Sequence, residues 1–210
     1  MAEIPRTRAS LLVRIRDPHD EGAWAEFVGI YEPVLYRVAR QRGFQDADAR
    51  ELTQEVFIAV ASAIDRWELD PARGKFRTWL FRIARNLSIN LLASRRRHPQ
   101  GTGDTDVQVL LDQQPEPRAE DSALFDTEYK RELFGQAASR VRGQFREASW
   151  QAFWRTSVEG EEIPEVARAL GVSVGAVYIA RSRVMTRLRE EVERLQGQQG
   201  DRDGGSIVRV

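Results

Sequence analysis

Apolar side chains recur at every third or fourth position along most of the chain, and this spacing constrains the possible folds strongly. Because an α-helix completes a turn in about 3.6 residues, such spacing gathers the apolar groups on one side of a helix. The alternation of apolar and polar residues that marks a half-buried strand is nearly absent. The sequence therefore predicts an all-α protein.

The first 98 residues predict one helical domain. Amphipathic helices are expected over residues 10–16, 23–42, 47–65 and 76–95. Gly43 is expected to end the second of these helices, because glycine readily adopts the left-handed conformation found there. Since each helix carries one apolar stripe, the four can share a single core.

The remaining residues predict a linker, a second domain and a tail. Residues 99–122 are rich in glycine, proline and acidic side chains, as is typical of a flexible linker. Helical spacing resumes afterwards, so a second domain is expected over residues 123–196. Residues 197–210 are rich in glycine and glutamine and predict a disordered tail. The predicted architecture is two small helical domains, residues 1–98 and 123–196, joined by an acidic linker.

Charge is balanced over the whole chain but segregated along it. The 32 basic and 32 acidic residues cancel, which argues against a uniformly basic coat for nucleic acid. Residues 66–98 nevertheless contain nine basic residues and only two acidic ones, and residues 168–189 contain five arginines and no acid. Between them, residues 104–128 hold eight acids and one base. The two basic zones suit contacts with DNA phosphates.

The composition excludes several kinds of site. The chain has no cysteine, so a disulfide framework, a thiolate zinc site and a cysteine nucleophile are excluded. His19 and His98 are too few for a histidine metal cluster, and no glycine-rich phosphate loop is present. We therefore expect no enzymatic activity, no cofactor and no metal. We also expect no membrane insertion and a cytoplasmic location, because no apolar run approaches about 20 residues and the start lacks a signal-peptide core.

Residues 163–195 have the pattern of a helix-turn-helix motif. Pro164 suits the first turn of a helix, Gly171 supplies a left-handed turn residue, and Ser173 can cap the next helix. The second helix of such a motif enters the major groove of DNA. At about 100° per residue, its inward side is formed by Val177, Val184, Leu188 and Leu195.

The outward side of this second helix is the candidate DNA-reading surface. Arg183 can bond to guanine or phosphate, and Ile179 can meet the methyl group of thymine. A helical hairpin with a solvated basic face would show the same pattern. The candidate contact residues are Ser173, Gly175, Ala176, Ile179, Ser182, Arg183 and Thr186.

The helix expected over residues 47–65 presents a second candidate surface. Glu51, Gln54 and Glu55 surround an outward-facing Ile58. An apolar group framed by acids and an amide suits docking on a basic partner surface. A solvated helix face with a single isoleucine is an equal alternative.

The helix expected over residues 76–95 carries a basic face behind its apolar stripe. The polar residues of this face are Arg77, Arg82, Arg85, Asn86 and Asn90. With the preceding loop of residues 68–75, they suit gripping a single DNA strand and holding an extruded base. The nearby aromatic residues can serve the same purpose or the core, and we assign Phe76 and Trp79 to the core.

Three motifs follow one another in a specific order. They are Asp48-Ala49 through Leu52 with Gln54-Glu55-Val56-Phe57, then Gly74-Lys75-Phe76-Arg77-Thr78-Trp79-Leu80-Phe81-Arg82-Ile83-Ala84-Arg85-Asn86-Leu87, then Val174-Gly175-Ala176-Val177. Together they closely resemble the extracytoplasmic-function (ECF, group IV) RNA polymerase sigma factors of the sigma-70 family. The resemblance covers about residues 24–97, as the sigma-2 domain, and about residues 124–195, as the sigma-4 domain. It implies a bacterial alternative sigma factor; the alternative is a stand-alone helix-turn-helix transcriptional regulator.

The resemblance also implies a role for each surface. Docking on core RNA polymerase, at the coiled coil of its β′ subunit, is implied for Asp48, Glu51, Gln54, Glu55 and Ile58. Recognition and melting of the −10 promoter element are implied for Asp70, Arg73, Lys75, Arg77, Arg82, Arg85, Asn86 and Asn90. The helix from Val174 would read the −35 element and lie near the β flap. An anti-sigma protein is a further candidate partner, because relatives are often held by one.

One departure from the family pattern bears on promoter choice. Many relatives carry a basic and polar run after the Val-Gly-Thr-Val turn, where this chain has Tyr178-Ile179-Ala180-Arg181. Two polar or basic contacts expected from the family are therefore replaced by other side chains. We expect the preferred promoter sequence to differ accordingly.

Overall fold

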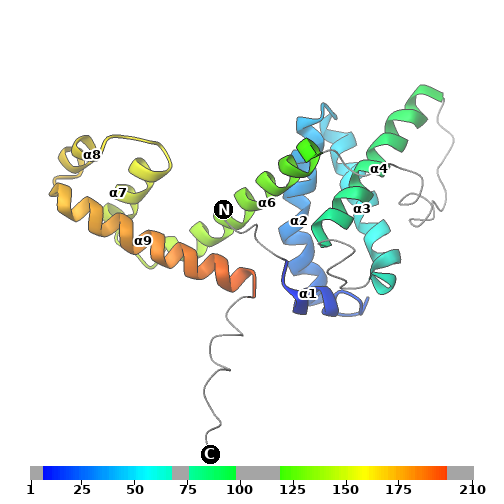
Figure 1. Cartoon of the computed structure of the whole chain (residues 1–210), viewed down its shortest axis with the longest axis horizontal. Helices are drawn as coiled ribbons and strands as arrows, with labels where there is room; N and C mark the ends of the chain where they lie inside the picture. The colour runs from blue at the N-terminus through cyan, green and yellow to red at the C-terminus, as the bar shows by residue number, and fades with distance from the viewer. Residues whose placement is uncertain (1–6, 68–75, 98–118, 198–210) are drawn as a thin grey trace, which may run out of the picture. The chain divides into compact units, whose positions relative to one another are not determined.

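The computed structural model describes residues 7–67, 76–97 and 119–197 (Figure 1). All regular elements in these ranges are helices, which confirms the predicted all-α class. Asp70, Arg73 and Lys75 lie outside the described residues, as do most of the predicted linker and of the predicted tail.

The chain divides into two compact units, Met1–Glu132 (unit 1) and Leu133–Val210 (unit 2). The boundary falls inside α6 (Ala119–Arg142), so the first half of this helix belongs to unit 1. The sequence instead places the start of the second domain at residue 123. The difference arises because side chains of the first half of α6 contact α2 and α4, as described below. The functional division into domains stays a prediction.

Unit 1 is built on three long helices, in agreement with the predicted spacing. Its elements are α1 (Ala9–Arg14), α2 (Glu21–Gln41), α3 (Asp46–Ala63), the short 3-10 helix η1 (Ile64–Arg66) and α4 (Phe76–Arg97). Asp20 caps α2 by accepting a hydrogen bond from the backbone N–H of Ala23 at 2.9 Å. Gly43 follows α2 with φ +88°, the left-handed conformation predicted for it. α3 packs between α2 and α4.

Aromatic rings form the centre of the unit 1 core. Phe27 is fully buried and lies with ring-centroid distances between 4.9 and 5.9 Å from Trp24, Tyr31, Phe57 and Phe76. Phe76 is buried and Trp79 lies against it at 5.5 Å, as their assignment to the core predicts. These contacts join α2, α3 and α4.

Unit 2 contains the predicted helix-turn-helix. It continues from the second half of α6 into α7 (Glu147–Ser157), α8 (Ile163–Leu170) and α9 (Val174–Leu195). Gly171 ends α8 with φ +65°, and the Ser173 hydroxyl caps α9 by accepting from the N–H of Ala176 at 3.1 Å. A small core of Ala152, Ala167 and Val177 joins α7, α8 and α9.

The inner side of α9 is buried as predicted. Val177, Val184, Leu188 and Leu195 are all buried, and Glu191 is buried with them. The Glu191 carboxylate accepts from Arg194 at 2.7 Å and from Arg140 on α6 at 3.3 Å.

Within the described ranges, no single helix is long and apolar enough to span a membrane. α8 and α9 reach the required length and apolarity only when taken together, and they are bent by 102° relative to each other.

Unit 2 is expected to lose stability in acid partly through Glu191. The hydrogen bond from Arg194 outweighs burial and, with Arg140, holds the pKa of Glu191 below its usual 4.5. A carboxyl with a lowered folded-state pKa stabilises the fold above its unfolded pKa, and this contribution disappears as the pH falls through the folded pKa. Glu191→Gln should therefore lower the urea midpoint of unit 2 at about pH 7 and have a smaller effect near pH 3. Equal losses at both pH values would contradict this account.

Candidate nucleic-acid and polymerase interfaces

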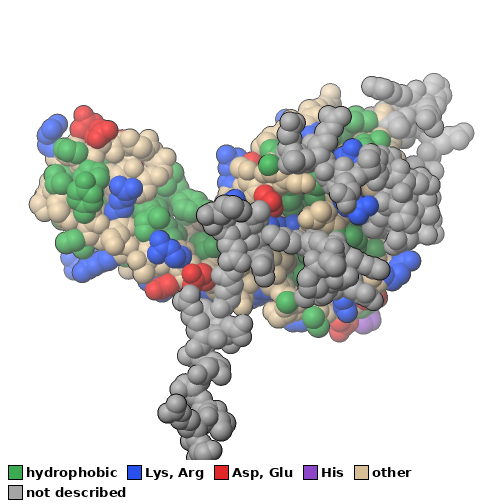
Figure 2. Space-filling view, in the orientation of Figure 1, with side chains coloured by type: hydrophobic (Ala, Val, Ile, Leu, Met, Phe, Trp, Pro, Cys, Tyr) green, Lys and Arg blue, Asp and Glu red, His purple; other side chains and the backbone are tan. Residues whose placement is uncertain are grey.

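The outward side of α9 is open over its first three turns. All seven predicted DNA-contact residues lie on the exposed surface of α9 or at its N-cap, and Ile179 is 55% exposed. Gly175 and Ala176 have small side chains or none, so little protrudes from the helix backbone at the start of this surface. Figure 2 shows hydrophobic and basic side chains together on the visible surface of unit 2. Such a surface can approach base edges closely while Arg183 reaches guanine or phosphate.

One large exposed residue of this region is absent from the candidate DNA-contact residues, although the sequence marks it as part of a departure from the family pattern. Tyr178 is 56% exposed and directly precedes Ile179. Its angular position, between the buried Val177 and the outward side, gives no clear assignment to either side. The sequence signal that favours including it is the departure noted above, in which Tyr178 and Ile179 replace polar or basic residues of the family pattern.

The outward side of α3 matches the predicted docking surface in four of five residues. Glu51, Gln54 and Glu55 are exposed, and Ile58 is 64% exposed. Asp48, which was included with them, is instead buried. The reason is its position one turn before the buried Leu52, on the inner side of the helix.

The predicted basic face of α4 is only partly at the surface. Arg82, Arg85 and Asn90 are partly exposed. Arg77 and Asn86 are 4% and 2% exposed, so their predicted outward orientation is wrong. Asn86 lies three residues after the buried Ile83 and shares its side of the helix. Arg77 is covered by the first half of α6.

A residue of α6 accounts for the burial of Arg77. Its Nη2 atom lies 3.1 Å from Oδ1 of Asp126, and its guanidinium stands 4.5 Å from the ring centroid of Tyr129. The carboxylate and the aromatic face both favour a cation at this position. In the described arrangement, α6 therefore covers the Arg77 side chain.

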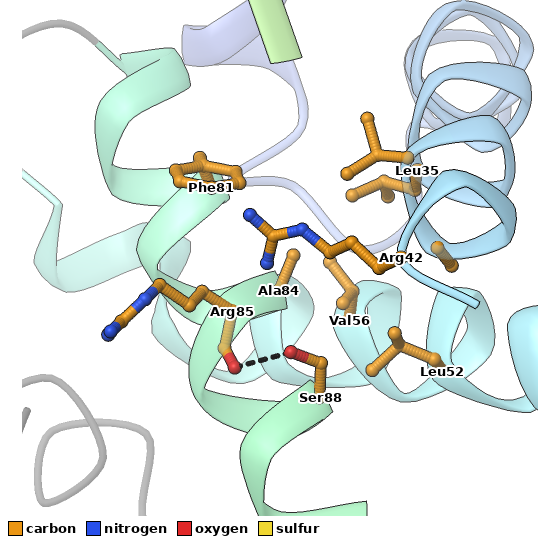
Figure 3. Close-up of a pocket in the computed structure, with 10 residues that line it drawn as sticks. Leu35, Arg42, Leu52, Val56, Phe81, Ala84, Arg85 and Ser88 are labelled. Carbon is orange, nitrogen blue, oxygen red and sulfur yellow. Dashed lines mark hydrogen bonds between the residues drawn. The ribbon is translucent and has the colours of Figure 1, made fainter. Parts of the chain in front are cut away.

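A small apolar pocket lies between α2, α3 and α4 (Figure 3). The guanidinium of Arg42 reaches across it, 5.2 Å from the ring centroid of Phe81. Ser88 donates a hydrogen bond to the backbone carbonyl of Arg85 at 2.6 Å, and the Arg85 side chain points away from the pocket.

Comparisons with known proteins match both units. The family model of sigma-70 region 2 matches residues 27–98. The RNA polymerase sigma factor NccH of Alcaligenes xylosoxydans xylosoxydans is 31% identical over 78% of this chain and 84% of its own length. The ECF RNA polymerase sigma factor ShbA of Streptomyces griseus is 30% identical over 83% of this chain and 90% of its own.

Two further matches concern a single relative. The RNA polymerase sigma factor CnrH of Cupriavidus metallidurans is 28% identical over 75% of this chain and 80% of its own length. The solved structure of CnrH in complex with the cytosolic domain of CnrY is 23% identical and covers 88% of this chain and 96% of that chain, with a TM-score of 0.32.

Proposed function

The chain belongs to the extracytoplasmic-function RNA polymerase sigma factors, and we propose that its three helical surfaces divide promoter recognition and polymerase docking among them. As an alternative sigma factor, it binds core RNA polymerase and directs promoter-specific transcription initiation. This membership does not favour the stand-alone regulator. The chain contributes binding and positioning, with no catalytic step of its own.

The outward side of α9 reads the −35 element. The observation that carries this proposal is the exposed face of a capped second helix in a helix-turn-helix, with Arg183 beside small residues and Ile179. Helices of this kind present their N-terminal residues to base edges in the major groove. We also assign to this unit the contact with the β flap of the polymerase, which the family resemblance implies.

The outward part of α4 recognises and melts the −10 element. Arg82, Arg85 and Asn90 supply cations and an amide for a displaced strand. Asp70, Arg73 and Lys75, outside the described residues, complete this surface on sequence grounds. Arg77 can contribute to this DNA-binding surface only if the first half of α6 separates from α4.

The outward side of α3 docks on the β′ coiled coil of core polymerase. Ile58 is an apolar anchor, and the surrounding acids favour a basic partner surface. Any protein that covers this side of α3 competes with the polymerase, and an anti-sigma protein is the class of regulator that we propose.

A run-off assay with purified core polymerase and genomic fragments tests this function. Initiation at discrete sites is expected only when the chain and core polymerase are both present. Without core polymerase, binding of the chain to the same duplexes should be weak and sensitive to salt, because its net charge is zero. Tight, salt-tolerant binding by the chain alone would contradict the proposal.

A thymine methyl group is the expected partner of Ile179. The −35 sequence can be selected from a randomised duplex library with the holoenzyme, and each thymine then replaced by uracil, which lacks the methyl. One replacement should lower holoenzyme affinity about fourfold, since burying a methyl group stabilises by about 0.8 kcal/mol. Ile179→Ala should remove this sensitivity, whereas Val158→Ala, at an exposed apolar residue after α7, should keep it. Uracil replacements without effect anywhere would exclude the contact.

A further inference from the structure

A polar cluster holds the first half of α6 against α2. Arg37 donates through Nε to Glu128 Oε2 at 2.7 Å and through Nη2 to Glu132 Oε2 at 3.0 Å. Gln41 donates to the other oxygen of Glu128 at 2.8 Å. Glu128 is only 2% exposed, so its charge depends on these partners. Burial raises the pKa of Glu128, but the hydrogen bonds from Gln41 and Arg37 and the charges of Arg131 and Arg37 together hold it below its usual value.

Two aromatic contacts accompany this cluster. Tyr129 stacks on Tyr31 of α2, with ring centroids 5.6 Å apart and an interplanar angle of 15°. Phe125 packs against Phe81 of α4 at 5.5 Å. All four rings are buried. The first half of α6 is therefore docked on unit 1 by both charge and apolar area.

Arg77 is incompletely satisfied beneath this helix. Asp126 pairs with its Nη2 atom, but Nε and Nη1 are buried and have no hydrogen-bond partner among the described residues. Buried donors without acceptors, on a charged group above all, destabilise the arrangement that contains them. A ligand with several acceptor oxygens could also accept hydrogen bonds from Nε and Nη1, which neither Asp126 nor Tyr129 satisfies.

We propose that the first half of α6 is an internal competitor of DNA, in which the Asp126 carboxylate occupies the position of a DNA phosphate at Arg77. Guanidinium groups bind carboxylates and phosphates with the same donor geometry. Over residues 119–132 five acids outnumber two bases in the sequence, so this segment carries a net negative charge that disfavours a DNA strand beside it. This inference rests on the proposed role of the α4 surface in binding the −10 strand.

The docked and released states are expected to exchange. The Arg37 side chain is 29% exposed, so salt weakens its pairs with Glu128 and Glu132 more than it would weaken fully buried pairs. Releasing the first half of α6 exposes Arg77 and removes the nearby acids in one step. The apparent association constant of the chain for a single DNA strand then equals the association constant of the released state multiplied by the fraction of molecules in that state.

Arg37→Gln in the full chain tests the competition by the sign of its effect. The probe is a fluorescein-labelled single-stranded oligonucleotide of about 20 nucleotides, followed by fluorescence anisotropy. Losing a cation should weaken binding if charge alone matters, whereas releasing α6 should strengthen it. If the docked state dominates by about ten to one, the variant binds up to about tenfold tighter.

Matched variants separate release from general charge effects. Arg142→Gln removes an arginine of unit 2 that is paired with Glu147 at 3.7 Å, and it should leave binding unchanged or weaken it. Adding Arg77→Ala to Arg37→Gln should abolish the gain. Glu132→Gln weakens the same polar cluster by a change on α6, and it should also raise the affinity for the oligonucleotide. This second variant keeps the test valid if Arg37→Gln does not fold.

The outcomes distinguish this inference from the proposed function. If wild-type holoenzyme fails to initiate in the run-off assay, the function fails regardless of the oligonucleotide result. If it initiates, but Arg37→Gln and Glu132→Gln bind the strand no better than wild type, the internal competition is overturned. A gain that persists without the Arg77 side chain overturns it as well.

Discussion

Ile58→Asp is expected to reduce the affinity of the chain for core RNA polymerase by at least about 30-fold, the equivalent of about 2 kcal/mol at an interface hot spot. Ile58 is 64% exposed on the outward side of α3, with Glu51, Gln54 and Glu55 around it. The variant replaces the apolar anchor by a charge that must lose its hydration on docking. Because the side chain makes little contact within unit 1, the melting temperature should stay unchanged. Titration of fluorescently labelled chain with core polymerase measures the effect.

Val13→Asp supplies the matched control for this experiment. Val13 is 62% exposed on α1, so the substitution removes a comparable apolar group from another surface of unit 1. Its affinity for core polymerase should remain within about twofold of wild type. Equal losses in the two variants would mean that the α3 surface is not the docking site and that added negative charge alone weakens binding.

The elements of the fold were predictable because their signals are local. Pro164, Gly171 and Ser173 each act on the backbone within a few residues, and the turn and cap of the helix-turn-helix follow from them. The inner side of α9 follows from helical periodicity, because a stripe of apolar residues has only one stable orientation. The exposed residues of α9 are then fixed by elimination.

The buried polar residues were not predictable in the same way. The burial of Arg77 depends on Asp126 and Tyr129, which lie about fifty residues away along the chain. Its position on a helical wheel gives the direction of the side chain but says nothing of a helix that covers it. Asp48 presents a similar difficulty. Its position one turn before the buried Leu52 places it on the inner side of α3, whereas its charge favours the outer side.

The division of α6 between the two compact units was not predictable, for a related physical reason. Apolar spacing from Phe125 through Tyr129 to Leu133 and beyond predicts one continuous helix, which is confirmed. The stripe does not indicate which set of helices covers each half. Arg37, Gln41 and Arg77 decide this through contacts with Asp126 and Glu128 that have no signature in local sequence.

Phe27→Ala is expected to remove about 3 to 5 kcal/mol of the unfolding free energy of unit 1, out of a typical total of about 5 to 15 kcal/mol. The ring is fully buried and touches rings from α2, α3 and α4, so its loss leaves a cavity at the point where the three helices meet. Aromatic neighbours that are large and mutually packed can collapse only partly into that space.

Hydrogen exchange measures this loss separately in each unit. Amides of α2 and α3 should exchange much faster in Phe27→Ala, while those of α7 and α9 keep their wild-type protection. Phe145→Ala, at a half-buried ring in unit 2, should leave α2 and α3 unchanged. Since the proposed docking surface on α3 and the proposed DNA surface on α4 both depend on this core, Phe27→Ala should lose polymerase binding and initiation together as temperature rises. Retained initiation alongside unprotected α2 amides would show that these surfaces form without the aromatic core, and would contradict the fold-based account of both.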